Sequence, residues 1–340
     1  MAKIVCFGEI MLRLSPKGYL RFVQSDSFDV NYGGGEANVA VSLANFKMDA
    51  AFVTKVPANE IGQAAVNDLR RYGVDTKHIA WGGERLGIYF LEKGASQRPS
   101  KVVYDRKQSS ISDADLDDFN WNDIFEGAQW FHFTGITPAL SDKVAEITLQ
   151  ACIAAKKMGL MVSCDLNFRK NLWTSEKANS VMGGLMNYVD LCIANEEDSE
   201  KVFGIVADDT NINHGKLNHE GYMKVAQQLK TRFGFKKVAI TLRESISASD
   251  NHWAAMLFDG DHYYFSKSYP VHIVDRVGGG DSFGAGLIYA LIHQYDGQSA
   301  IEFATAASCL KHSIEGDVNH VTVAEVKTLA GGDGSGRVQR

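Results

Sequence analysis

The chain has 340 residues and a formal net charge of −6 at pH 7. Hydrophobic residues make up 45% and charged residues 22% of it, which is typical of a globular protein with a sizeable core. The mild acidity argues against a nucleic-acid-binding protein, and no run of about 18 apolar residues is present that would cross a membrane. The N-terminal residues lack the apolar stretch of a signal peptide, so we expect a cytoplasmic protein.

Strand-like runs alternate with segments of helical period over most of the chain. We expect strands at 3–7, 51–56, 130–134, 160–165, 191–194 and 237–242, and helices at 36–46, 61–72, 142–157 and 222–233. This alternation predicts an α/β fold, with βαβ units on a parallel sheet that is covered on both faces. Further on we expect a hairpin from strands at 252–258 and 262–265, followed by helices at 281–294, 299–313 and 322–329.

Two segments interrupt the alternation. Residues 12–32 and 85–107 are rich in β-branched and aromatic residues and have no helical period. We predict that they pair into a small separate sheet, which forms a lid over one edge of the main domain, itself spanning residues 1–330. Residues 207–220 are polar and predict an exposed loop, and the Gly-rich residues 331–340 predict a flexible tail.

The sharpest chemical signal is the run Gly278-Gly279-Gly280-Asp281, directly before a helical apolar pattern. Successive glycines let several main-chain N–H groups turn toward one point, and the positive end of a helix dipole adds to them, so the run predicts a phosphate site. Asp281 either caps the helix or acts as a general base on a hydroxyl beside that site. The spacing alone slightly favours the cap, because caps are the commoner role.

Other nucleotide-binding motifs are incomplete. The sequence contains no G-x-x-x-x-G-K-[ST] run, which argues against a P-loop ATPase. Neither glycine cluster, 33–38 or 278–283, completes G-x-G-x-x-G. A dinucleotide-dependent oxidoreductase is therefore only weakly supported.

Residues 275–286 resemble the C-terminal signature of the ribokinase-like (PfkB) carbohydrate kinases, and the run Gly33 to Asn38 resembles their N-terminal Gly-Gly signature. The two signatures lie about 240 residues apart, and the resemblance covers roughly residues 3–328. It implies a three-layer α/β/α fold with a mostly parallel central sheet and a small β-sheet lid. It also implies transfer of a phosphoryl group from ATP, with Mg²⁺, to a sugar hydroxyl.

The resemblance assigns roles to individual residues. Asp281 becomes the base, and the main-chain amides of residues 278–281 stabilise the transferring phosphoryl group. Asn195 and Asp198 resemble the family's Asn-x-x-Glu motif near Mg²⁺, with Asp one methylene shorter; the alternative is an acidic first helical turn. Nucleotide contacts are expected from Asn167, Arg169, Asn195, Thr241, Arg243, Gly278 and Gly280, where Arg243 stands in place of a family glycine.

The chain also carries features that favour an acidic sugar. Arg169 follows a predicted strand, at the edge where α/β sheets bind ligands, and Tyr104 and Arg106 face one side of an extended segment. With Tyr89 on the other predicted lid strand, two arginines and two hydroxyls would bind a carboxylate. This pattern resembles the 2-keto-3-deoxygluconate kinases of the family, and it implies sugar contacts from Gly34, Gly35, Asn38, Tyr89, Tyr104, Arg106, Arg169, Asp281 and Asp317.

These features together predict transfer of the ATP γ-phosphate to the 6-hydroxyl of 2-keto-3-deoxygluconate. A neutral-sugar kinase such as fructokinase and a non-catalytic sugar-acid sensor on the same fold are the alternatives. The family also implies a homodimer formed through the lid. It leaves open a monovalent cation such as K⁺ near the loop that begins at Asp275.

Overall fold

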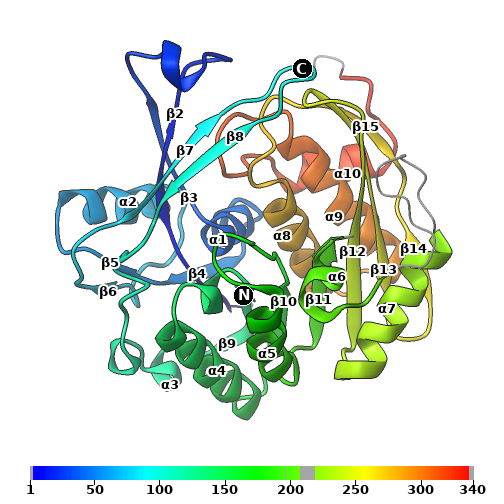
Figure 1. Cartoon of the computed structure of the whole chain (residues 1–340). Coiled ribbons are helices and arrows are strands. Elements are labelled where there is room, and N and C mark those ends of the chain that lie inside the picture. The colour runs from blue at the N-terminus through cyan, green and yellow to red at the C-terminus, as the bar shows by residue number, and fades with distance from the viewer. Residues whose placement is uncertain (1–2, 196, 207–218, 337–340) are drawn as a thin grey trace.

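The computed structural model describes residues 3–195, 197–206 and 219–336. Nine strands of this part form a central sheet in the order β14-β13-β12-β11-β10-β9-β1-β4, with β15 paired to β13 (Figure 1). The parallel strands are β4 (Asp49–Val53), β1 (Lys3–Phe7), β9 (Ala128–Thr134), β10 (Met161–Asp165), β11 (Leu191–Asn195) and β12 (Lys237–Ser245). The antiparallel strands are β13 (Asp250–Phe258), β14 (Tyr263–Phe265) and β15 (Tyr269–His272).

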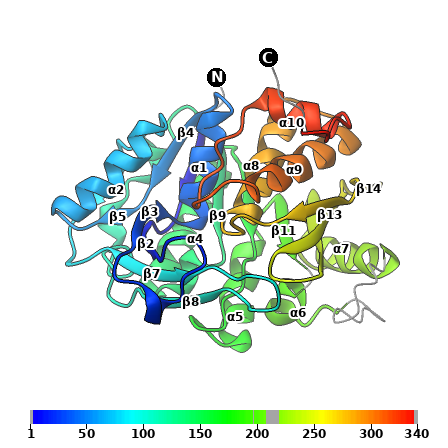
Figure 2. The ribbon, with the colours of Figure 1, turned by 90° about the horizontal axis from the view of Figure 1, so that it is seen from above.

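Helices cover both faces of this sheet (Figures 1 and 2). Alternate residues of β1 show why: Ile4 and Cys6 belong to one apolar cluster, and Val5 and Phe7 belong to another. Side chains of a strand point to opposite faces, so a strand that is apolar at every position must be covered twice. The first cluster includes α1 (Gly35–Asn45), α2 (Glu60–Arg71), α8 (Gly279–Ile292), α9 (Gly297–Lys311) and α10 (Val323–Ala330). The second includes α3 (Trp121–Ile124), α4 (Asp142–Lys157), α5 (Ser175–Met186), α6 (Asp198–Phe203) and α7 (His219–Phe233).

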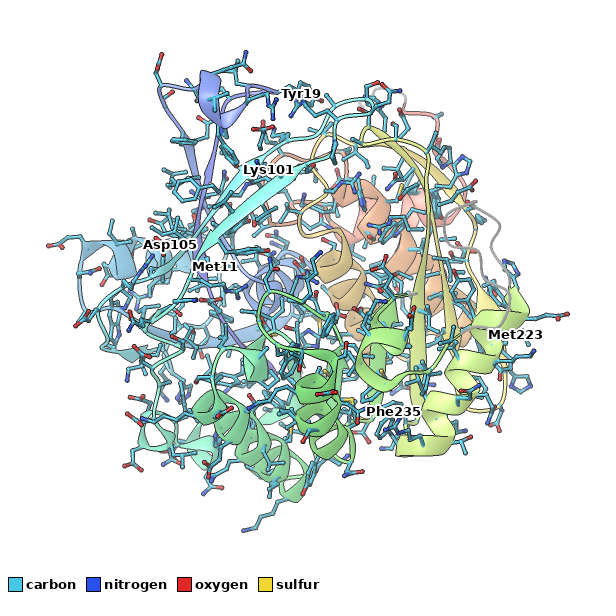
Figure 3. The ribbon with its side chains drawn as sticks, in the orientation of Figure 1. Met11, Tyr19, Lys101, Asp105, Met223 and Phe235 are labelled. Carbon is cyan, nitrogen blue, oxygen red and sulfur yellow. The ribbon has the colours of Figure 1, made fainter. Side chains whose placement is uncertain are left out.

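A separate four-stranded sheet, here called the small sheet, has the order β3-β2-β7-β8. Its strands are β2 (Met11–Ser15), β3 (Asp29–Gly33), β7 (Gly87–Glu92) and β8 (Lys101–Asp105). The strand β8 forms one edge and runs from Lys101 to Asp105, and Tyr19 lies in the connection between β2 and β3 (Figure 3). The two segments that interrupt the alternation in the sequence therefore pair as predicted, although about 50 residues separate them along the chain.

The predicted α/β fold with a mostly parallel sheet and a small separate sheet is confirmed, and most predicted elements agree with the structure to within two or three residues. The ends of two predicted strands were wrong, and some elements were missed. The strand predicted at 51–56 ends at Val53, and β5 (Lys55–Val56) pairs instead with β6 (Ala80–Trp81). The helix α5 was not predicted, because Gly183 and Gly184 weaken its helical pattern. The strand predicted at 237–242 continues to Ser245, so Arg243 lies within β12.

The predicted loop at 207–220 falls mainly on residues 207–218, which lie outside the described residues, while His219 and Glu220 already belong to α7. The predicted tail reaches beyond the last described residue, Gly336, and it stays a prediction. Among the described residues, no helix combines the length and the apolar character needed to cross a membrane.

Candidate active site

A cavity of about 470 Å³ lies between the small sheet and the carboxyl ends of the central strands. Every site residue predicted from the sequence lines it: Gly34, Gly35, Asn38, Tyr89, Tyr104, Arg106, Asn167, Arg169, Asn195, Asp198, Thr241, Arg243, Gly278, Gly279, Gly280, Asp281 and Asp317. Parallel strands bring their carboxyl ends to one edge, which explains how residues of β10, β11 and β12 meet there. The cavity therefore unites both glycine signatures with the lid strands.

The run of three glycines forms the turn that starts α8. Gly278 is the N-cap and has a φ of 81°, and a Cβ at this position would lie 1.9 Å from the carbonyl oxygen of Asp317, so only glycine fits. The amide of Gly279 closes the turn by donating to the carbonyl of Arg276 at 3.3 Å. The amides of Gly280 and Asp281 lie in the first helical turn, where no carbonyl of the helix reaches them. This end of the helix is suited to an anion in the cavity.

Asp281 is the third residue of α8 and does not cap it, so the cap interpretation is wrong. Its Oδ2 accepts a hydrogen bond of 2.7 Å from the side-chain amide of Asn38. A Cβ on Gly35 would come within 3.6 Å of Asp281 Oδ1, so the N-terminal glycine turn also lies against this carboxylate. Desolvation raises the pKa of Asp281 to about 7, Asn38 opposes this shift, and the charge of Glu36 adds to it. A carboxylate with such a pKa is suited to general base catalysis near neutral pH.

Two further carboxylates lie near Asp281. Burial raises the pKa of Asp165 well above its usual value, and the charges of Asp198 and Asp281 add to that rise. Asp165 ends strand β10, and the sequence analysis missed it, although a carboxylate at the end of a buried parallel strand is itself a signal. The mutual repulsion of these groups would be relieved by a cation.

Asn195 and Asp198 hold each other in place. The Oδ1 atom of Asn195 accepts from the amides of Glu197 (2.8 Å) and Asp198 (2.9 Å), and the carboxylate of Asp198 accepts from the amides of Asn195 (3.3 Å) and Phe168 (3.0 Å). Within the described part of the chain, no group of three or more His, Cys, Asp or Glu side chains could hold a metal ion directly. Asn195 and Asp198 supply side-chain oxygens at the cavity wall, the kind of ligand that Mg²⁺ takes, so they fit a magnesium ion that is carried by nucleotide phosphates and contacts the protein through water.

Arg106 and Arg169 both line the cavity, but their surroundings differ. Arg106 is buried and pairs with the buried carboxylate of Glu9, which also accepts from the hydroxyl of Ser109 at 3.0 Å. Its guanidinium lies 5.2 Å from the ring of Tyr104, so these two side chains point together as the sequence predicts. The Nη1 of Arg169 donates to the carbonyl of the preceding residue at 3.0 Å. Arg169 forms no carboxylate ion pair among the described residues.

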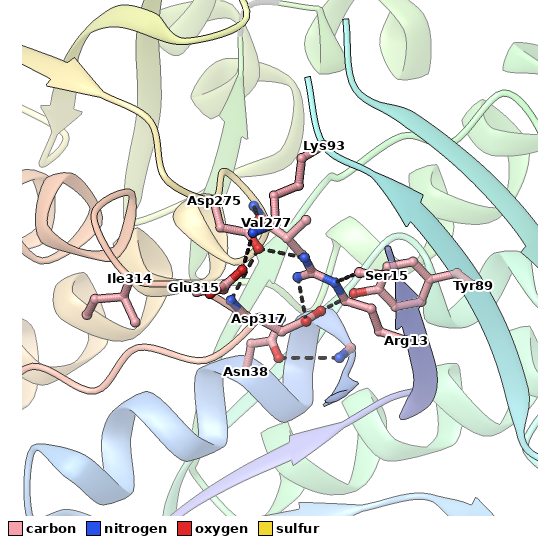
Figure 4. Close-up of polar contacts among 12 residues, drawn as sticks. Arg13, Ser15, Asn38, Tyr89, Lys93, Asp275, Val277, Ile314, Glu315 and Asp317 are labelled. Atoms are coloured by element: carbon pink, nitrogen blue, oxygen red, sulfur yellow. Dashed lines mark hydrogen bonds and ion pairs between the residues drawn. The ribbon is translucent and has the colours of Figure 1, made fainter. Parts of the chain in front are cut away.

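Tyr89 and Asp317 are joined by a hydrogen bond that the sequence did not reveal. The Tyr89 hydroxyl donates to Asp317 and is therefore engaged by the protein rather than free for a carboxylate ligand. Asp317 also accepts from Arg13 Nη1 at 2.9 Å, and Arg13 Nη2 donates to Asp275 at 2.5 Å (Figure 4). Arg13 is fully buried and comes from β2, so it ties the small sheet to the loops beside α8.

Two arginines lie near the start of α8 on the opposite side of the cavity. Arg243 is exposed, while burial and the charge of Arg243 lower the pKa of Arg276. The Nη2 of Arg276 donates to Ala248 at 3.2 Å, and its Nε is buried without an acceptor. Two like charges next to a helix N-terminus favour a polyanion. Arg276 was missed by the sequence analysis, although it lies only two residues before the glycine run.

Comparisons with known proteins show which family this chain resembles. A family model described as pfkB family carbohydrate kinase matches residues 1–322. A crystal structure of 2-dehydro-3-deoxygluconokinase from Thermotoga maritima is 54% identical, with a TM-score of 0.94 over 97% of this chain and 98% of that one. The 2-dehydro-3-deoxygalactonokinase of Haloferax volcanii is 31% identical over 98% of both chains. The 2-dehydro-3-deoxygluconokinase of Thermoproteus tenax is 26% identical over 93% of this chain and 90% of its own.

The chain belongs to the PfkB family of carbohydrate kinases, and its fold is ribokinase-like. It is a carbohydrate kinase, so the cavity is the place to look for phosphoryl transfer to a sugar hydroxyl. The fold and family predicted from the sequence are confirmed.

Proposed function

We propose that this protein transfers the γ-phosphate of ATP to the 6-hydroxyl of 2-keto-3-deoxygluconate, giving 2-keto-3-deoxy-6-phosphogluconate. The observation that carries the proposal is the placement of Arg106 and Arg169 in the same cavity as Asp281. A neutral sugar needs no such cations, whereas a sugar acid has a carboxylate to pair with them. Relatives named as kinases of 2-dehydro-3-deoxy sugar acids support this choice.

The sugar acid would lie between the small sheet and α1. Its carboxylate would meet Arg169 and the face of Arg106 that Glu9 does not occupy, with Tyr104 beside them. Gly35 lacks a side chain, and this leaves room for the sugar beside Asn38 and Asp281. Gly34 also lines the cavity, but a Cβ there would lie 1.9 Å from the carbonyl oxygen of Glu9, so this glycine allows the main chain to pack closely. The hydroxyl of Tyr89 donates to Asp317, so these two residues would contribute to the sugar site as a joined pair.

The nucleotide would lie across the carboxyl ends of β11 and β12. Its phosphates would meet the amides at the start of α8 together with Arg243 and Arg276, and Asn167, Asn195 and Thr241 line the same side of the cavity. A magnesium ion on these phosphates, near Asp165 and Asp198, would neutralise charge as it develops. Asp281 would accept the proton of the 6-hydroxyl, whose oxygen would then attack the γ-phosphorus in line with the leaving ADP oxygen.

The small sheet would act as a lid that excludes water, which would otherwise accept the phosphoryl group. Val30 and Val103 of this sheet are exposed and do not line the cavity, and Val23, in the connection between β2 and β3, is 90% exposed. Exposed apolar surface of this kind favours association, so we propose a homodimer through this sheet. The cytoplasmic location stays a prediction.

A comparison of phosphate acceptors tests the proposed function. The protein, ATP and Mg²⁺ are incubated with 2-keto-3-deoxygluconate, with its galactonate epimer and with fructose, and ADP release is measured for each. We expect kcat/KM for the sugar acids to exceed that for fructose by roughly a hundredfold or more, because a ligand without a carboxylate makes no charge-assisted hydrogen bonds to Arg106 and Arg169. A preference for fructose would instead support the fructokinase alternative, and no turnover with any acceptor would support a sensor.

A further inference from the structure

The fully buried lysine Lys311 has no part in the site described above. It is the last residue of α9, and its ammonium donates to the carbonyl of Ile314 at 3.0 Å. A Cβ on Gly278 would lie 3.3 Å from Lys311 Cε, so the lysine lies directly beneath the turn that starts α8. Desolvation disfavours the charged form of a buried lysine, so an ammonium at this position requires nearby negative charges to stabilise it.

Nearby carboxylates supply those charges. Burial lowers the pKa of Lys311 and the charge of Arg13 adds to this effect, while the charges of Asp275, Asp317 and Asp281 oppose it. Arg13 pairs with Asp275 and Asp317, and it is as deeply buried as Lys311 (Figure 4 shows the Arg13 pairs). Below the turn, Arg13 and Lys311 therefore lie among the carboxylates of Asp275, Asp317 and Asp281, of which Arg13 pairs with the first two.

Three oxygens of this region, both of the Asp275 carboxylate and the His312 carbonyl, already accept hydrogen bonds. Asp275 Oδ2 accepts from Arg13 and from the amide of Gly316 (3.2 Å), and Asp275 Oδ1 accepts from the amide of Val277 (3.1 Å). The carbonyl of His312 accepts from the amides of residues 274 (2.8 Å) and 275 (3.2 Å), which joins the two loops. A monovalent cation needs several oxygens with free lone pairs, and a third positive charge would unbalance the cluster. The residues present therefore do not fit a K⁺ ion near the loop that begins at Asp275.

We propose that the ammonium of Lys311, with the guanidinium of Arg13 beside it, is a built-in replacement for a monovalent cation beneath the Gly278–Asp281 turn. Lys311 is a positioning residue: it holds the turn against the loop 314–317 and keeps a fixed positive charge below the amides that face the transferring phosphoryl group. Phosphoryl transfer then needs no K⁺. This inference rests on the kinase function proposed above, but not on which sugar acid is the acceptor.

The first test uses the unaltered protein. Thermal midpoints and initial rates are measured in chlorides of K⁺, Na⁺, Li⁺ and tetramethylammonium at equal ionic strength. We expect the midpoints to coincide and kcat to vary by less than about twofold, because no site discriminates among these ions. A saturable rise in the midpoint, or in kcat, that is specific to K⁺ would overturn the proposal. The midpoints need no acceptor, so this readout stays valid if the proposed function fails.

The second test removes the lysine. In Lys311→Met we expect kcat to fall by roughly tenfold or more, with a smaller change in the KM for the sugar, because the fixed charge acts on the transition state. We also expect K⁺, but not tetramethylammonium, to restore part of kcat and to raise the thermal midpoint of this variant. The control Lys55→Met removes a half-buried lysine that pairs with Asp118 and does not line the cavity, and it should leave kcat unchanged.

Full kcat of a folded Lys311→Met variant in tetramethylammonium chloride would refute the role of Lys311. A purely structural lysine would lower the midpoint without the K⁺-dependent recovery of kcat, and that outcome would also refute it. If the variant does not fold, the salt series on the unaltered protein decides the question by itself.

Discussion

The side-chain amide of Asn38 donates a 2.7 Å hydrogen bond to the carboxylate of Asp281, which lies 243 residues further along the chain. This bond joins the N-terminal glycine signature on α1 to the C-terminal one on α8. It also fixes one carboxylate oxygen, so that the other is directed to the side where Gly35 leaves space. The two signatures are therefore parts of one site.

The first prediction concerns Asp281 as the base. In Asp281→Asn we expect kcat to fall by roughly a thousandfold, since general base catalysis contributes about that much, while the Kd of the sugar acid changes little. The amide keeps the shape of the side chain and can still accept from Asn38. Isothermal titration and steady-state kinetics separate the two effects. Asp261→Asn, in an exposed loop, is the matched control. Near-normal turnover of Asp281→Asn would remove Asp281 as the base.

The second prediction concerns pH. The pKa of Asp281 is raised to about 7, mainly by desolvation, and only the ionised carboxylate can accept a proton. The value of kcat/KM should therefore fall tenfold per pH unit below about pH 7 and level off above it. Asn38 favours the ionised form of Asp281, so in Asn38→Ala the decrease of kcat/KM should begin at a higher pH. If kcat/KM fell only below about pH 4 in both proteins, another group would limit the rate.

The third prediction concerns the sugar carboxylate. Arg169→Ala should raise the KM for the sugar acid by roughly ten- to a hundredfold, because a charge-assisted contact contributes about 1.5–3 kcal/mol. Arg106→Ala should do the same and also lower the thermal midpoint, because it leaves the buried Glu9 without its partner. Combining Arg106→Ala with Glu9→Gln should recover the midpoint but not the KM. If neither arginine affects the KM, the carboxylate lies elsewhere.

The fourth prediction concerns the nucleotide. Arg243→Ala and Arg276→Ala should each raise the KM for ATP by roughly tenfold and leave the KM for the acceptor unchanged, since both line the nucleotide side of the cavity. Arg232→Ala, on α7, is a control that removes an arginine without touching the cavity. A change in the acceptor KM alone would place these arginines at the sugar instead.

The fifth prediction concerns stability. Arg13→Met leaves Asp275 and Asp317 buried without their cation, which should cost about 3–5 kcal/mol of unfolding free energy. Arg71→Met removes an exposed ion pair with Asp68 and should cost less than about 1 kcal/mol. Urea unfolding followed by circular dichroism compares the two. Equal stabilities of both variants would contradict the view that Arg13 ties the small sheet to the core.

The parts of the site predicted from the sequence are those that local signals define. Gly278 and Asp281 are recognisable because a left-handed turn before a helix demands glycine and places the next residues at an anion site. The strand β1 and the hairpin of β13 and β14 are likewise evident, since continuous apolar runs and a short turn identify them.

The residues that were missed act through partners far away in the chain. Arg13 is a single arginine in an extended segment, and its partners lie 262 and 304 residues away. Glu9 pairs with Arg106, which lies 97 residues further along the chain. In the sequence, Lys311 has no feature that distinguishes it from other lysines at helix ends. Nothing in the local pattern separates such side chains from solvent-exposed ones, because burial is a property of the packed fold.

The central claim is that the start of α8 and Asp281 surround the transferring phosphorus. It is tested most directly by a crystal structure with ADP, Mg²⁺, aluminium fluoride and 2-keto-3-deoxygluconate, in which aluminium fluoride takes the place of the phosphoryl group. We predict that its fluorides lie about 2.7–3.1 Å from the amides of Gly280 and Asp281, and that the Asp281 carboxylate contacts the 6-hydroxyl. Aluminium fluoride bound away from residues 278–281, or a 6-hydroxyl held by another base, would contradict the account.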